Sequence, residues 1–97
     1  TYNGVPYESK DGSARYKDGT LIGTAVGLSE LVGRFVAYTD CSFEDAVACV
    51  SSNPAGVLGL GGSKGAIAAG MDADLVLLDA DGSVHTTIVD GRVVYRK

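Results

Sequence analysis

Basic residues, proline and tryptophan are scarce in this sequence. Its 97 residues include eight lysines and arginines against twelve aspartates and glutamates, two prolines, one histidine and no tryptophan. The net charge is −4 and the basic residues are dispersed, so we expect no nucleic-acid partner, because phosphate backbones are bound by clustered cations. Fourteen scattered glycines and 45% hydrophobic residues indicate a globular chain and not a disordered one.

Long hydrophobic runs are also absent. No apolar stretch approaches the roughly 20 residues that a membrane-spanning helix needs, and no charged-then-apolar leader precedes Thr1. We therefore expect no membrane partner and a soluble, cytoplasmic protein. The missing initiator methionine suggests that Thr1 is a processing, proteolytic or cloning boundary.

Potential metal ligands and reactive thiols are few. His85 is the one histidine, it lies in an expected strand, and no acidic pair with ligand spacing is near it, so we interpret it as a structural or surface residue. Cys41 and Cys49 lie eight residues apart, a spacing that fits neither a close metal pair nor a disulfide framework. We expect two reduced, mostly packed thiols; a regulatory disulfide has no supporting feature.

The first two thirds of the chain predict a hairpin followed by helices. Residues 1–17 have strand-like spacing around a turn at Lys10-Asp11-Gly12. A helix is expected to begin at Ser29 as its cap and to end near residues 38–40. A second helix opens at Ser42, and a third has Pro54 in its first turn and ends at Gly59.

In the last third of the chain, the spacing of apolar residues changes from a helical pattern to one typical of β-strands. The phrase KGAIAAGMDADLVLL, residues 64–78, indicates a strand, a glycine turn and a buried strand, with Asp72 and Asp74 in turn and hydrogen-bonding roles and not as paired catalytic acids. Strands 75–78, 84–89 and 92–95 are separated by Asp-Gly dipeptides and predict a three-stranded meander. The glycines of residues 59–65 are interpreted as a connecting loop and not as a phosphate cradle, because they follow a helix.

Two sequence motifs resemble those of a known family. Residues 64–79 resemble the form KGxIxxGxDADLVxLD of metal-dependent amidohydrolases, which lies where a catalytic barrel passes into a small β-sandwich. Residues 18–24, DGTLIGT, resemble the DGTLAGS phrase of N-acetylglucosamine-6-phosphate deacetylases. The order of the intervening helices is also similar to that family, and the resemblance covers roughly the whole chain.

The resemblance implies an α/β fold in two parts. Residues 1–63 would be the C-terminal end of a TIM-like (β/α)8 metal-hydrolase barrel, comprising a hairpin, a substrate loop and helices. Residues 64–97 would be the last strands of a small β-sandwich domain.

The resemblance also implies a function. The chain would be the C-terminal part of a deacetylase that hydrolyses N-acetyl-D-glucosamine 6-phosphate to D-glucosamine 6-phosphate and acetate in amino-sugar catabolism. It implies a divalent metal ion and a homodimer for the intact enzyme. The Glu, His and catalytic Asp residues would lie in earlier barrel strands, so this chain would hold no catalytic residue and no metal ligand, and would be inactive without the rest of the barrel.

Three substrate-binding residues can be carried over from the resemblance: Leu21, Ile22 and Gly23. A glycine permits close approach of the backbone to a ligand, and neighbouring amides can donate hydrogen bonds. The alternative is an ordinary connecting loop. Ile22 and Thr24 depart from the family phrase, and the larger Ile22 side chain would narrow the sugar pocket.

Two other functions remain open from the sequence. The first alternative is that the chain belongs to a different amidohydrolase, such as a cyclic amidase or deaminase. The second is that it is a noncatalytic binding or assembly module. The phrase at residues 18–24 distinguishes the first alternative, and cooperative unfolding of the isolated chain distinguishes the second.

Overall fold

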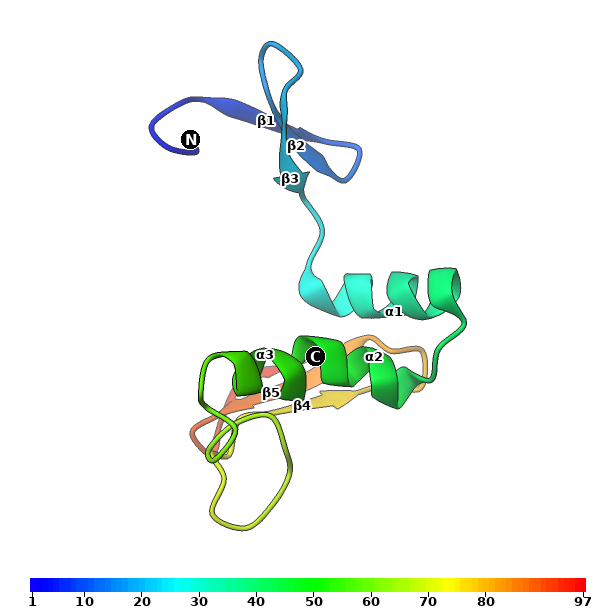
Figure 1. Cartoon of the computed structure of the whole chain (residues 1–97), viewed down its shortest axis with the longest axis vertical. Coiled ribbons are helices and arrows are strands. Elements are labelled where there is room, and N and C mark those ends of the chain that lie inside the picture. Colours follow the sequence, from blue (N-terminus) through cyan, green and yellow to red (C-terminus); the bar gives the residue numbers. More distant parts are fainter.

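Six strands and three helices make up the structure, a computed structural model that describes all of residues 1–97. They form two separate three-stranded antiparallel sheets, ordered β1-β2-β3 and β4-β5-β6, with the helices between them in the sequence. The elements are β1 (Tyr7–Lys10), β2 (Ser13–Tyr16), β3 (Leu21–Thr24), α1 (Leu28–Thr39), α2 (Phe43–Val50), α3 (Ser52–Val57), β4 (Leu75–Leu78), β5 (Val84–Val89) and β6 (Arg92–Arg96). In Figure 1 the first sheet projects away from the helices at the end of an extended linker.

The first sheet begins with the predicted hairpin. Asp11 and Gly12 both have positive φ angles, 54° and 77°, as a two-residue turn between β1 and β2 requires. The strand β3 then pairs with β2, so residues 21–23 lie in a strand and not in the loop that the sequence predicted. The loop prediction was wrong because a strand of four residues has too short a pattern to recognise without its partner.

The N-cap of the helix α1 lies two residues earlier than predicted. Gly27 occupies the N-cap position with extended backbone and no side-chain cap, whereas Ser29 lies inside the first turn. The prediction that Ser29 caps this helix was therefore wrong. The predicted end is confirmed: Asp40 has a φ of 57° and its N–H donates to the Val36 carbonyl at 2.9 Å.

The helices α2 and α3 have the predicted signals at their ends. The Ser42 hydroxyl accepts a hydrogen bond from the Asp45 N–H at 3.1 Å and so caps α2. Pro54 lies in the first turn of α3. Beyond α3, Gly59 has a φ of 73°, and the Leu60 N–H donates to the Ala55 carbonyl at 2.8 Å, the bond that marks a glycine-terminated helix.

The second sheet is the predicted meander. Val89 pairs with Arg92 across a two-residue turn in which Asp90 and Gly91 have φ angles of 50° and 73°. Two expectations fail. Residues 64–74 form a loop and not a strand, and the residues of β4 are half-buried or exposed, because nothing in this chain covers that strand.

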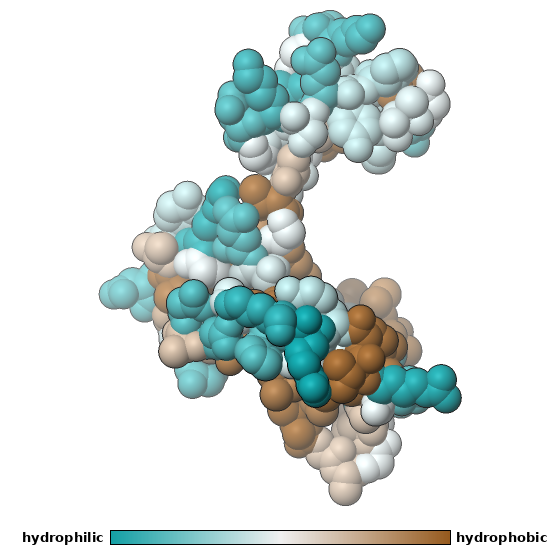
Figure 2. Space-filling view, turned by 180° about the vertical axis from the view of Figure 1, so that it is seen from behind, coloured by the Kyte–Doolittle hydropathy of each residue, from teal (hydrophilic) through white to brown (hydrophobic).

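Little of the apolar surface is covered. Only Val32, Ala46, Ala55 and Thr86 are buried, and the accessible surface is 7156 Å². A compact protein of this mass exposes about 5,200 Å² and has a radius of gyration of about 12.5 Å, whereas the radius of gyration of this structure is 16.2 Å. Figure 2 shows hydrophobic patches on the part of the molecule that holds the helices and the β4–β6 sheet. These faces lack the partner surface that a layered domain provides.

Candidate functional site

The turn between β2 and β3 is held rigidly by hydrogen bonds. The Asp18 carboxylate accepts from the Thr20 N–H at 2.9 Å, and the Arg15 guanidinium donates to the Gly19 carbonyl at 3.0 Å. Donation from the Thr20 backbone N–H, and then from its side chain, lowers the pKa of Asp18. Gly19 has a φ of 90°, which a residue with a side chain adopts only under strain. The DGT phrase is therefore the sequence of a fixed turn that sets where β3 begins.

A β-bulge lies in β3 at the residues that the sequence singled out. Arg15 pairs with Leu21 and Ala14 pairs with Gly23, so β3 has one residue more than β2 in this interval. The extra residue is Ile22. A bulge of this kind bends the strand and turns a side chain away from the regular alternation, and bulges are common beside active sites.

Gly23 leaves open space beside the backbone. An added Cβ would meet no atom within 4 Å, and no positive φ is required at this position. Nothing within the chain therefore demands glycine at residue 23. Because β3 pairs only with β2, its outer edge also leaves backbone N–H and C=O groups free for a ligand.

The exit from β3 is fixed to the first hairpin. The Ala25 N–H donates to the Gly12 carbonyl at 2.8 Å, and the Thr24 hydroxyl donates to the same oxygen at 3.4 Å. Leu21, Ile22 and Gly23 are thus fastened at both ends, although Leu21 is exposed and the other two are half-buried. The structure brings these three residues together in one strand; their role as substrate contacts stays a prediction.

Two hollows of the surface lie away from these three residues. A small one of about 560 Å³ is lined by Val5, Pro6, Tyr16, Lys17 and Asp18. A large one of about 1750 Å³ lies between the helices and the β4–β6 sheet and is lined mainly by apolar residues, including Val32, Val47 and Leu75. The large hollow is the space bounded by the uncovered faces and not an enclosed ligand pocket.

The residues of this chain do not fit a metal centre. No three side chains of His, Cys, Asp or Glu gather closely enough to hold a metal ion. His85 is exposed on β5, and its Nδ1 atom lies 2.8 Å from the Thr86 hydroxyl. No step of a reaction is therefore assigned to a metal held by residues 1–97.

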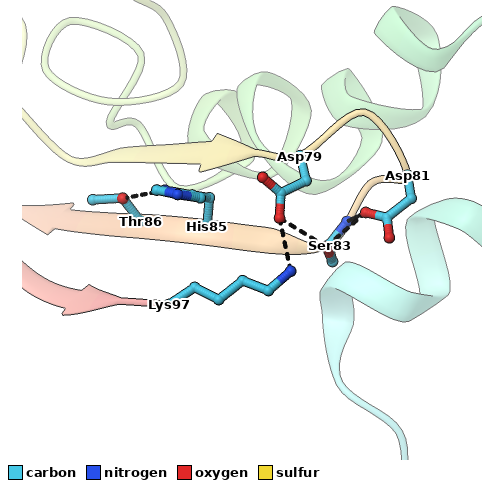
Figure 3. Close-up of polar contacts among 6 residues, drawn as sticks. All are labelled: Asp79, Asp81, Ser83, His85, Thr86 and Lys97. Atoms are coloured by element: carbon cyan, nitrogen blue, oxygen red, sulfur yellow. Dashed lines mark hydrogen bonds and ion pairs between the residues drawn. The ribbon is translucent and has the colours of Figure 1, made fainter.

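A second polar cluster lies at the turn between β4 and β5 (Figure 3). The Ser83 hydroxyl lies 2.6 Å from Asp81 Oδ1 and 3.3 Å from Asp79 Oδ2, and the Lys97 ammonium donates to Asp79 at 2.9 Å. The Lys97 ammonium lowers the pKa of Asp79, and the Ser83 hydroxyl lowers that of Asp81.

This cluster does not form a catalytic triad. The His85 ring contacts Thr86 and makes no hydrogen bond with Ser83, so no imidazole is placed to act as the base of a Ser-His-Asp arrangement. Two ionised carboxylates and an ammonium close the turn and fasten residue 97 to it. This network joins residues 18 positions apart, and no local sequence signal predicted it.

The remaining sequence-based expectations have mixed outcomes. Asp74 accepts a hydrogen bond from the Asp90 N–H at 2.8 Å, which confirms its predicted hydrogen-bonding role. Cys41 and Cys49 are both free thiols, but Cys49 is exposed and not packed. None of the three helices has the length and apolar character needed to cross a bilayer.

Comparisons with known proteins agree with the resemblance found in the sequence. Residues 14–94 match the amidohydrolase family. The chain is 39% identical over 88 residues to the human N-acetylglucosamine-6-phosphate deacetylase, an alignment that covers 89% of this chain and 22% of the human protein. The chain therefore spans about a fifth of the length of this curated relative.

Solved structures give the same result for the fold. The N-acetylglucosamine-6-phosphate deacetylase from Thermotoga maritima superposes with a TM-score of 0.87 and 41% identity, over 100% of this chain and 26% of that protein. A mutant of the deacetylase from Mycobacterium smegmatis, in complex with N-acetyl-D-glucosamine-6-phosphate, superposes with a TM-score of 0.75 and 31% identity, over 91% of this chain and 24% of that one. The arrangement of this chain's elements is thus that of a segment of such deacetylases.

Proposed function

This chain belongs to the amidohydrolase family, and on that premise we propose that it is the C-terminal segment of a metal-dependent deacetylase. The substrate is N-acetyl-D-glucosamine 6-phosphate, and the products are acetate and D-glucosamine 6-phosphate, in amino-sugar catabolism. The observation that carries this proposal is the DGTLIGT phrase at a rigid turn and bulged strand, in a chain 41% identical to a deacetylase of known structure.

The proposal divides the chain into two parts. Residues 1–63 belong to the end of a (β/α)8 catalytic barrel, and residues 64–97 belong to a small β-sandwich. The change from helices to a separate sheet after residue 63 supports this division. The exposed apolar faces support it too, since barrel strands and further sandwich strands would cover them.

Leu21, Ile22 and Gly23 contact the sugar in this proposal. The bulge turns Ile22 out of the regular alternation, and the open space at Gly23 admits a ligand against the backbone. Free amides at the outer edge of β3 are hydrogen-bond donors of the kind that orient hydroxyl or acyl oxygens. The chain's part in the reaction is to bind and orient the substrate.

The reacting groups lie elsewhere in the full-length protein. The divalent metal ion that the resemblance implies would be held by residues outside this chain, where it would supply an activated water for hydrolysis of the acetamide. We also propose a homodimer, as the resemblance implies, which light scattering on the full-length protein tests. A cytoplasmic location is supported by the two free thiols, which suit a reducing compartment.

The test is a side chain placed at Gly23 in the full-length protein. Gly23→Val adds a β-branched residue that suits a strand, and its Cβ would have no atom of this chain within 4 Å. We expect kcat/KM for N-acetylglucosamine 6-phosphate to fall by about tenfold or more, the effect of losing one good contact, while thermal unfolding stays unchanged.

The matched control is Gly61→Ala, because Gly61 also has open space but lies in the loop after α3. Its kcat/KM is expected to stay at the parent value. A Gly23→Val enzyme with the parent kcat/KM would remove Gly23 from the substrate site.

A further inference from the structure

Residues 63–72 form a loop whose two ends are held together by a hydrogen bond and an ion pair. The Asp72 N–H donates to the Ser63 carbonyl at 2.8 Å, and the Lys64 ammonium lies 2.9 Å from the Asp72 carboxylate. The same ammonium also contacts the Asp74 carboxylate. One cation thus joins the start of the loop to two anions at its end.

The Asp74 carboxylate extends this contact to the β5–β6 turn. Its second oxygen accepts from the Asp90 N–H at 2.8 Å, and the neighbouring Ala73 carbonyl accepts from the Gly91 N–H at 3.0 Å. The Lys64 ammonium, and then the Asp90 N–H, lowers the pKa of Asp74, as expected for a carboxylate that receives both. The turn between β5 and β6 is therefore fastened to the residues that hold Lys64.

The backbone of Lys64 belongs to the helical part of the chain. Its N–H donates to the Leu60 carbonyl at 2.9 Å, in the turn that ends α3. The next residue, Gly65, lies against the start of α3, since an added Cβ would be 2.9 Å from the Ser52 Cα atom. The side chain of Lys64 reaches Asp72 and Asp74, just before β4, while its backbone is bonded in the turn that follows α3.

Other ion pairs do not join these two parts. Arg34 pairs with Glu30 inside α1, and Lys97 pairs with Asp79 inside the sheet. Residues of the helices and of the β4–β6 sheet both line the large hollow. Lys64 is the one charged side chain that bridges the helical part and the sheet.

We propose that the Lys64 ammonium, shared by Asp72 and Asp74, is a strap that fixes the β5–β6 turn relative to the end of α3. The strap works by charge, because it needs one cation to satisfy two carboxylates. A side chain of the same length without charge leaves those carboxylates facing each other, and the turn loses its anchor.

Hydrogen exchange at single amides of the full-length protein tests this strap. In Lys64→Met the amides of Asp72, Asp90 and Gly91 are expected to exchange roughly two- to fivefold faster, the range that an exposed ion pair supports. Lys64→Arg keeps the charge and can bridge two carboxylates, so it is expected to restore the parent rates. The Ala25 amide, bonded to Gly12 in the first sheet, is expected to keep its rate in both variants.

Two outcomes overturn the strap. Parent exchange rates at Asp90 and Gly91 in Lys64→Met would show that the ammonium holds nothing there. Equal acceleration in Lys64→Met and Lys64→Arg would show that the shape of the lysine side chain matters and its charge does not.

If Lys64→Met does not fold, the salt dependence of hydrogen exchange in the unsubstituted protein tests the strap independently. Raising the salt concentration from about 0.05 to 0.5 M screens exposed ion pairs. If the strap holds the turn, the exchange rates of the Asp90 and Gly91 amides are expected to increase more with salt concentration than the rate of the Ala25 amide. The same response at all three amides contradicts it.

Discussion

Gly65 is held more tightly than any other glycine of this chain. Its φ is +94°, and an added Cβ would lie 2.9 Å from the Ser52 Cα atom and 3.1 Å from the Ala55 Cβ atom. The first of these neighbours is backbone, which does not yield easily. The KG of the family phrase is therefore a contact between the loop and α3 as well as a turn.

Gly65→Ala is expected to destabilise the full-length protein by about 2 kcal/mol or more, because backbone strain and overlap with α3 add. The control is Gly70→Ala, which has a φ of +86° but open space around it, and is expected to cost only about 1 kcal/mol. Denaturant unfolding measures both. Equal losses would mean that the contact between Gly65 and α3 contributes nothing.

Asp79 gives a prediction about pH. Its pKa is lowered from the ordinary value of 3.8 by the Lys97 ammonium, so the ion pair stabilises the fold above that value and the stabilisation is lost as pH falls through the lower pKa. NMR titration of the Asp79 carboxyl is expected to give a midpoint below 3.8, and Lys97→Met is expected to raise it. Lys10→Met, which removes a cation outside the ion pairs, leaves the midpoint unchanged. A midpoint insensitive to Lys97 would contradict the pairing.

At the scale of elements, local signals predicted most ends and missed what depends on distant partners. The cap at Ser42, the glycine end of α3 and the Asp-Gly turns were predictable, because each is made by residues a few positions apart. The strand β3 and its bulge exist only through pairing with β2. Lys64 and Asp74 lie ten positions apart and meet only once the chain has folded.

Ser42 and Ser29 both lie near the start of a helix, but only Ser42 is an N-cap. Ser42→Ala removes the oxygen that accepts from the Asp45 N–H and is expected to cost about 1 kcal/mol of unfolding free energy. Ser29→Ala is expected to change it by less than about 0.5 kcal/mol, because Ser29 makes no cap and alanine favours helix. Chemical denaturation followed by circular dichroism compares them. A larger loss at Ser29 than at Ser42 would reverse this assignment.

At the scale of the whole molecule, the uncovered apolar surface decides how the chain behaves alone. The accessible surface exceeds that of a compact protein of this mass by about 2,000 Å², more than the roughly 800 Å² that each partner buries in a standard interface. Phe35, Val76 and Val94 are among the exposed side chains. The exposed apolar area is large enough for an interface with another protein segment and larger than a small ligand would cover.

Residues 1–97 alone are therefore expected to self-associate and to unfold without a sharp transition. Sedimentation velocity and scanning calorimetry measure the two properties. A monomer that melts cooperatively would favour the noncatalytic module over a segment of an enzyme.

In the proposed function, these residues serve a deacetylase whose metal ligands lie outside them. The direct measurement is acetate release from N-acetylglucosamine 6-phosphate with added divalent metal, by the full-length protein and by residues 1–97 alone. We expect turnover by the full-length protein and none by residues 1–97 alone. Turnover by residues 1–97, or an inactive full-length protein that is folded and metal-loaded, would contradict it.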